Sequence, residues 1–165
     1  MVCYTPYTSY RKNEITMLLT RRLAKYKNRL LVACFVLILS SCAIHLVSDF
    51  DKQSLQQMQA VASQVEQHFI SLQYVEKSQR LFEQSKDNYI AIEVALQALK
   101  VRQAMRPLNE QTLKQVDIAL DLWSKDIASH KKQNTVSDFI LQRHRQQYQR
   151  LFLAMIKGEE AKKVN

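Results

Sequence analysis

Glycine and proline are scarce in this chain of 165 residues, which contains one glycine, Gly158, and two prolines, Pro6 and Pro107. An all-β chain needs many tight turns, and such turns are usually built from glycine, proline or Asn-Gly pairs. The scarcity therefore argues against a β fold and favours long helices joined by few turns. It also excludes the glycine-rich loops that hold phosphate in P-loop and dinucleotide-binding proteins.

Cysteine is absent from residue 43 onward, because the three cysteines are Cys3, Cys34 and Cys42. The region after residue 42 has no thiol for a disulfide, a zinc site or a nucleophile. Four histidines are present, and none belongs to an HExxH pair: His45, His68, His130 and His144. We therefore expect no metal, no cofactor and no catalytic residue, and we predict that the chain is not an enzyme.

Positive charge is unevenly distributed along the chain. The formal net charge is +9, yet residues 1–48 hold seven basic side chains and one acidic side chain, whereas residues 49–165 hold 17 and 14. Most of the excess lies next to the longest uncharged stretch, where basic residues determine membrane orientation. Membrane orientation explains the charge without nucleic acid, and we expect no nucleic-acid partner.

The longest uncharged stretch, residues 30–48, reads LLVACFVLILSSCAIHLVS. A helix of that length is just long enough to cross the roughly 30 Å hydrocarbon core of a bilayer. Basic residues precede the stretch and acidic residues follow it, so the positive-inside rule keeps residues 1–29 in the cytoplasm. We predict that residues 30–48 are a transmembrane anchor or a lipoprotein signal, that residues 49–158 form an extracytoplasmic helical domain, and that residues 159–165 are a charged, frayed tail.

Within this stretch, Leu39-Ser40-Ser41-Cys42 resembles the lipobox of bacterial lipoprotein precursors, in which small residues precede a cysteine that becomes lipid-modified and N-terminal after cleavage. The resemblance implies that Cys42 is lipidated and that the mature chain is sorted to the outer membrane, since Ala43 rather than an aspartate follows. A start at Met17 would give a conventional signal, and residues 1–16 would then not be translated. The alternative is an uncleaved anchor in the inner membrane, facing the periplasm, in which Cys42 is one more small membrane residue.

Apolar residues recur with helical spacing after residue 49, which predicts an all-α domain. A first seam with steps of three and four consists of Leu55, Met58, Ala62, Val65, Phe69 and Leu72. The seam lies between the apolar stretch and the rest of the domain, where a partner within the chain is not evident. We therefore expect a coiled-coil stalk and a homo-oligomer held through Leu55, Met58, Val65, Phe69 and Leu72.

Two breaks are predicted in the middle of the domain. Ser85-Lys86-Asp87-Asn88 combines weak helix formers with N-cap residues and predicts a joint, with a continuous rod as the alternative. Pro107 lacks an amide donor, so a helix should end near Met105. Asn109 can then cap the following helix.

The last helix should begin after a polar run, with Thr135 or Ser137 as its N-cap, and should end at Gly158. Trp123 and Phe139 fall on the apolar seams and are expected in the core. Short connections place neighbouring helices antiparallel, so we predict a three- or four-helix bundle behind the N-terminal membrane or signal helix.

The densest basic stretch of the domain could meet lipid headgroups, cell-wall polymer or an acidic partner through Arg143, His144, Arg145 and Arg150. The alternative interpretation is a solvated helix face, because short charge runs usually are solvated.

An anchor followed by helices without site chemistry favours a non-enzymatic adaptor or assembly factor of the bacterial cell envelope, of the secretion, pilus, conjugation, exclusion or lysis type. Such a protein would bind another envelope protein through its helix faces. The alternative is an extracytoplasmic bundle that binds a small ligand between its helices as an accessory to a receptor. A polar-lined cavity between helices would favour this second hypothesis.

Overall fold

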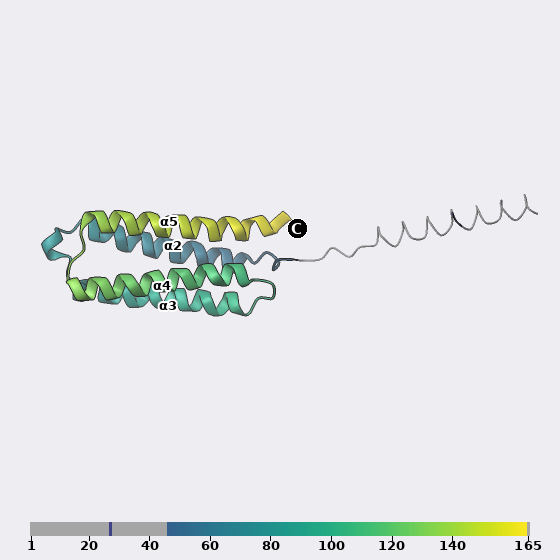
Figure 1. Ribbon diagram of the computed structural model, residues 1–165, viewed down its shortest axis with the longest axis horizontal. Coiled ribbons are helices and arrows are strands. Elements are labelled where there is room, and N and C mark those ends of the chain that lie inside the picture. The colour runs from purple at the N-terminus through teal and green to yellow at the C-terminus, as the bar shows by residue number, and fades with distance from the viewer. Residues whose placement is uncertain (1–26, 28–45, 165) are drawn as a thin grey trace, which may run out of the picture. The chain divides into compact units, whose positions relative to one another are not determined.

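The computed structural model describes Lys27 and residues 46–164 (Figure 1). Residues 46–164 contain four α helices and no strand: α2 (Lys52–Gln73), α3 (Phe82–Ala104), α4 (Glu110–Gln133) and α5 (Asp138–Ala161). Two short 3-10 helices lie at Lys77–Gln79 and Lys162–Val164. The predicted all-α class and helical bundle are therefore confirmed, with four helices.

Each helix runs antiparallel to the next along the chain (Figure 1). α2 packs against α3 and α5, and α4 also packs against α3 and α5, so the four helices surround a single core. The connections are short enough to hold consecutive helices side by side. The bundle is therefore of the up-and-down type.

The core is filled by the helical seams, with Trp123 fully buried at its centre. The expected core position of Trp123 is confirmed, whereas Phe139 is 69% exposed and its expected core position is wrong. Phe139 lies in the first turn of α5, where Leu141 is the residue that faces inward and is fully buried. A seam read from spacing alone is ambiguous in a first turn, because two neighbouring apolar residues can both fit it.

The first seam is also part of this core. Its residues Leu55, Met58, Val65, Phe69 and Leu72 are all buried, and α3 and α5 cover α2. The expectation that this seam has no partner within the chain is wrong. No stalk between protomers is required to cover it, because the chain's own last helix does so.

The connection between α2 and α3 lies earlier than predicted. Residues 74–81 form it, while Ser85-Lys86-Asp87-Asn88 lies inside α3, so the predicted joint at those residues is wrong. Arg80 holds the connection, because its Nε donates to the Val75 carbonyl (2.8 Å) and its Nη1 to the Val136 carbonyl (3.0 Å). The joint is thus fixed by a contact with the α4–α5 connection rather than by local helix propensity.

The other helix ends follow the sequence more closely. α3 ends at Ala104 with Met105 as its C-cap, Asn109 occupies the N-cap position of α4, and the Ser137 side chain accepts from the Ile140 amide (3.4 Å) at the start of α5. The predicted end of α3 and the predicted start of α5 are confirmed. The prediction for Asn109 is confirmed in position only, because its side chain makes no cap hydrogen bond and donates to Gln103 instead.

The end of α5 differs from the prediction. α5 continues through Gly158 to Ala161, and Glu159 is buried, so the predicted helix end at Gly158 and the frayed tail from residue 159 are wrong. A network of ion pairs around Glu159 holds this last turn in place.

Candidate functional site

One end of the bundle contains a buried network of charged side chains centred on Glu159. Arg106 donates to both carboxylate oxygens (2.8 and 3.0 Å), and Lys162 donates to Oε2 (2.8 Å). The Asp51 amide donates to Oε1 (2.8 Å). Burial by itself would raise the pKa of Glu159, but the hydrogen bonds from Arg106 and Lys162 outweigh it and lower that pKa below its usual value. The carboxylate is therefore ionised and fully paired.

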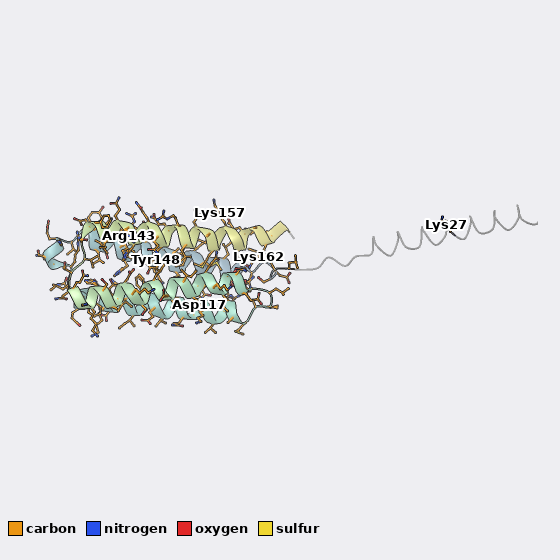
Figure 2. The ribbon with its side chains drawn as sticks, in the orientation of Figure 1. Lys27, Asp117, Arg143, Tyr148, Lys157 and Lys162 are labelled. Carbon is orange, nitrogen blue, oxygen red and sulfur yellow. The ribbon has the colours of Figure 1, made fainter. Side chains whose placement is uncertain are left out.

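The same network includes the point where the chain enters the bundle. Ser48, which the sequence places at the end of the apolar stretch, is buried among the helices. Its hydroxyl donates to Asn109 Oδ1 (2.9 Å) and accepts from Lys162 Nζ (2.8 Å), and Figure 2 shows Lys162 at this end of the bundle. Ser48 therefore belongs to the folded domain.

Asp51 joins this network to α3. Its side chain caps α2 by accepting from the Gln53 and Ser54 amides, and Arg102 donates to it with Nη2 (2.6 Å). Burial alone would raise the pKa of Asp51, but hydrogen bonds from Ser54 and Arg102 lower it to about 2. The network is a structural clasp whose polar groups are occupied by one another.

His130 is a buried histidine with both ring nitrogens engaged. Its Nε2 lies 2.9 Å from the Arg80 carbonyl oxygen, and its Nδ1 lies 3.0 Å from the Tyr89 hydroxyl. A carbonyl can only accept, so Nε2 carries a proton. Like the clasp, His130 serves the fold and offers no group to a ligand.

His68 is the opposite case. The residue is 3% exposed, and neither ring nitrogen has a hydrogen-bond partner in the described part of the chain. Its ring packs against those of Tyr89 (centroids 4.5 Å apart), Trp123 (5.4 Å) and Phe69 (5.5 Å). Burial, with a smaller contribution from His130, lowers the pKa of His68 to about 4, so the ring is neutral at physiological pH. A buried polar group without a partner is rare and requires an explanation.

A groove of about 260 Å³ lies next to this ring, between α2 and α3. Its walls consist of Gln64, Gln67, Ser71, Asn88 and Ala91, all of them exposed, and its deepest residues are the buried His68 and Ile92. No wall residue carries a formal charge. The groove therefore combines unpaired donors and acceptors with a small apolar surface.

A second surface feature lies on the outer face of α3. The helix buries Tyr89, Ile92 and Leu96 on one face. On the opposite face it exposes Ile90 and Val94, followed by Val101 (51%, 62% and 60% exposed). The exposed residues are four and seven positions apart and so share one face. This outer stripe, Ile90, Val94 and Val101, is apolar surface that the bundle itself does not use.

The predicted basic contact residues divide into two groups in the structure. Arg145 pairs with Glu66 on α2 through Nε (2.7 Å), and His144 Nδ1 lies 2.7 Å from Asp126 on α4. Arg143 and Arg150 are exposed on α5. The structure therefore brings two of the four side chains into contacts between helices and leaves two directed toward solvent.

Tyr148, one turn after His144, also contacts Asp126, because its hydroxyl donates to the carboxylate (3.0 Å). Tyr148 is buried and Arg143 is exposed, and Figure 2 labels both on α5. The spacing of His144 and Tyr148 thus corresponds to a shared contact with α4.

Several predictions concern residues outside the described part of the chain. The lipidation residue Cys42, the cytoplasmic segment 1–29 apart from Lys27, and most of the anchor, residues 30–45, lie there. Among the described helices, none has the length and apolar character needed to cross a membrane. Within the same residues, no group of three His, Cys, Asp or Glu side chains is placed to hold a metal ion.

Comparison of the chain with protein-family models, with curated proteins and with solved structures finds no match.

Proposed function

We propose that this chain is a membrane-anchored, non-enzymatic helical adaptor of the bacterial cell envelope that binds another envelope protein through a helix face. The observation that carries the proposal is the outer stripe of α3. A helix in a water-soluble bundle normally has one apolar face and one polar face, and a second apolar face is characteristic of a contact with another protein.

The proposed partner is an amphipathic helix of another envelope protein. The stripe is one helix wide, and Met105 (79% exposed) extends it beyond Val101. A pair of small domains that associates stably buries about 800 Å² on each side, which is more than a stripe of this width provides by itself. A single helix lying along α3 matches its width and its spacing.

The anchor is proposed from the charge pattern around residues 30–48, because a long uncharged stretch with basic residues before it and acidic residues after it directs the downstream chain across the membrane. The mass and N-terminus of the chain purified from membranes test this part. A chain that begins with an acylated Cys42 supports a lipoprotein, and an unprocessed N-terminus supports a spanning anchor. Recovery of the full-length chain dissolved in the cytosol would refute both.

The adaptor function is tested by photocross-linking from Val94 in intact cells, with Lys125, an exposed residue of α4, as the matched control position. We expect one defined adduct from Val94 and none from Lys125, and mass spectrometry should identify an envelope protein with an amphipathic helix. The substitution Val94→Asp, read with a cross-linker placed at Val101, should abolish the adduct without changing the thermal midpoint. Identical adducts from both positions, or recovery of this chain alone, would exclude the proposed partner.

A second candidate function is an extracytoplasmic ligand-binding bundle that serves as an accessory to a receptor. The observation that favours it is the polar-lined groove between α2 and α3, with the unpaired His68 at its base. The exposed Arg143 and Arg150 are compatible with either candidate function, since each function requires contacts with a molecule outside the chain.

A further inference from the structure

We propose that the groove between α2 and α3 at His68 binds a small uncharged molecule that carries hydroxyl or amide groups. This inference does not depend on the adaptor function, because the groove and the outer stripe lie on different faces of α3.

The first argument is the unused hydrogen-bonding capacity of His68. Its neutral ring offers one donor and one acceptor, and neither is used within residues 46–164. The ring contacts of His68 do not require a histidine, since a phenylalanine could also pack against Phe69, Tyr89 and Trp123. His130, in the same core, shows that this fold pairs a buried imidazole where the ring only has a structural role.

The second argument is the chemistry of the groove walls. The side chains of Gln64, Gln67 and Asn88 make no hydrogen bond within the described part of the chain, and Ser71 donates only to the His68 carbonyl (2.8 Å). Each amide side chain both donates and accepts, which complements a hydroxyl or an amide on a ligand. A charged ligand would meet no opposite charge in these walls. The groove therefore favours a neutral molecule that donates and accepts at several points.

The third argument is size. The groove volume of about 260 Å³ is close to the lower end of the roughly 300–1,000 Å³ range of ligand pockets. One water accounts for about 30 Å³ of liquid, so the groove is several times larger than needed for a single water on His68. Ala91 and Ile92 add an apolar wall against which a compact carbon skeleton can rest.

Access to the ring requires a movement of the walls, because both His68 nitrogens are shielded from solvent. Gln64 and Gln67 are exposed and lack hydrogen bonds that would fix them in the described structure. Rotation of an exposed side chain is fast, on the picosecond to nanosecond timescale. We expect rotation of these two side chains to open the imidazole to a ligand without separation of α2 from α3.

The experiment is a titration of the full-length chain with small probe molecules. Binding is monitored through the ¹⁵N chemical shifts of the histidine rings in NMR spectra. Three probes represent the ligand class: glucose carries hydroxyls, acetamide carries an amide, and N-acetylglucosamine carries both. We expect at least one probe to give saturable shifts of the His68 nitrogens, with a Kd in the millimolar range or below. The His130 nitrogens should stay unchanged, because that ring is fully paired.

Matched variants identify the groove as the source of the shifts. Asn88→Leu removes a wall amide and should raise the Kd about tenfold, the effect of losing one good hydrogen bond. Gln97→Leu removes an exposed amide of α3 that does not line the groove and should leave the Kd unchanged. His68→Phe, in which binding is followed by the backbone amide shifts of Asn88 and Ala91 in the groove wall, should abolish saturable binding.

Three outcomes would overturn the proposal. The first is the absence of saturable shifts with all three probes up to about 100 mM, well above the expected Kd. The second is equal movement of the His68 and His130 signals. The third is binding that Asn88→Leu and Gln97→Leu change to the same extent.

Discussion

Two regions of this bundle handle buried polar groups in opposite ways. At the end where the chain enters, the clasp surrounds Glu159 with Arg106, Lys162 and the Asp51 amide, so each charge has a partner. At the α2–α3 groove, His68 is equally buried and has no partner within residues 46–164. Pairing has a structural purpose in the clasp, whereas a group left unpaired in a comparably dry place is available for a ligand.

The largest effect on stability is expected when the clasp is disrupted. Glu159→Gln removes the charge that Arg106 and Lys162 are paired with, and leaving such partners unpaired typically costs about 3–5 kcal/mol. We expect a loss of that size in the free energy of unfolding, measured by urea denaturation. Glu160→Gln, at the exposed neighbouring position, is the control and should change the free energy little. Equal effects of the two substitutions would show that the clasp does not stabilise the fold.

Acid should have the next largest effect, through His68. Because the pKa of His68 is about 4 in the folded chain, against an ordinary histidine value of 6.5, the unfolded chain takes up the proton first as the pH falls. The contribution of His68 to the free energy of unfolding is therefore fully present above about pH 6.5. It is lost as the pH falls from there to about 4. One pKa unit corresponds to about 1.4 kcal/mol, so the total loss is about 3 kcal/mol. Urea denaturation across this range measures it.

The tyrosine that faces His68 does not change this window. Tyr89 on α3 and His130 on α4 are the titratable groups nearest the ring, and burial raises the pKa of Tyr89. Asp51 acts at lower pH. Because its pKa is about 2 in the folded chain, the stability that its carboxylate contributes is lost only in more acidic solutions. In His68→Phe the slope between pH 6.5 and 4 should become smaller, and an unchanged slope would assign it to other groups.

A smaller effect is expected from His130. His130→Phe leaves the Tyr89 hydroxyl and the Arg80 carbonyl without their partner, which should cost roughly 2 kcal/mol in the free energy of unfolding. Chemical denaturation near pH 7 is the measurement. A variant as stable as the parent chain would mean that water replaces the ring without loss.

The smallest effect should come from the same substitution at the other buried histidine. His68→Phe removes no hydrogen bond present within the described residues and keeps an aromatic ring against Tyr89 and Trp123. We expect a change in unfolding free energy within about 1 kcal/mol, in the stabilising direction. A loss as large as that of His130→Phe would show that His68 has a structural partner and would end the distinction between the two rings.

The fold could be predicted from the sequence where local chemistry decides it. Pro107 ended α3 near Met105, and Ser137 capped α5, because both act within one helical turn. The partner of the first seam could not be predicted, since α5 lies far along the chain and spacing within α2 does not identify it. The predicted end of α5 at Gly158 was wrong for a related reason. The ion pairs of Glu159 stabilise the last turn despite the weak helix preference of glycine.

The groove at His68 was harder to predict from the sequence than the fold. His68 lies three residues after Val65 and four before Leu72, so its spacing already places it on the buried face of α2. Whether a buried histidine is paired depends on the groups that α3 and α4 present to it, which a sequence does not display. The outer stripe of α3 could have been found, because Ile90, Val94 and Val101 repeat with helical spacing on the face opposite the core seam.

The hydrogen bond between Lys162 and Ser48 implies that the order of the helices along the chain could be changed. The start and the end of the bundle are adjacent, so a short linker from residue 164 to residue 46 would close the backbone into a circle. New termini could then be opened in the connection at 74–81, giving a circular permutant in which α3 comes first and α2 last. The neighbours of each helix around the core are fixed by packing, whereas the helix with which the polypeptide begins is not.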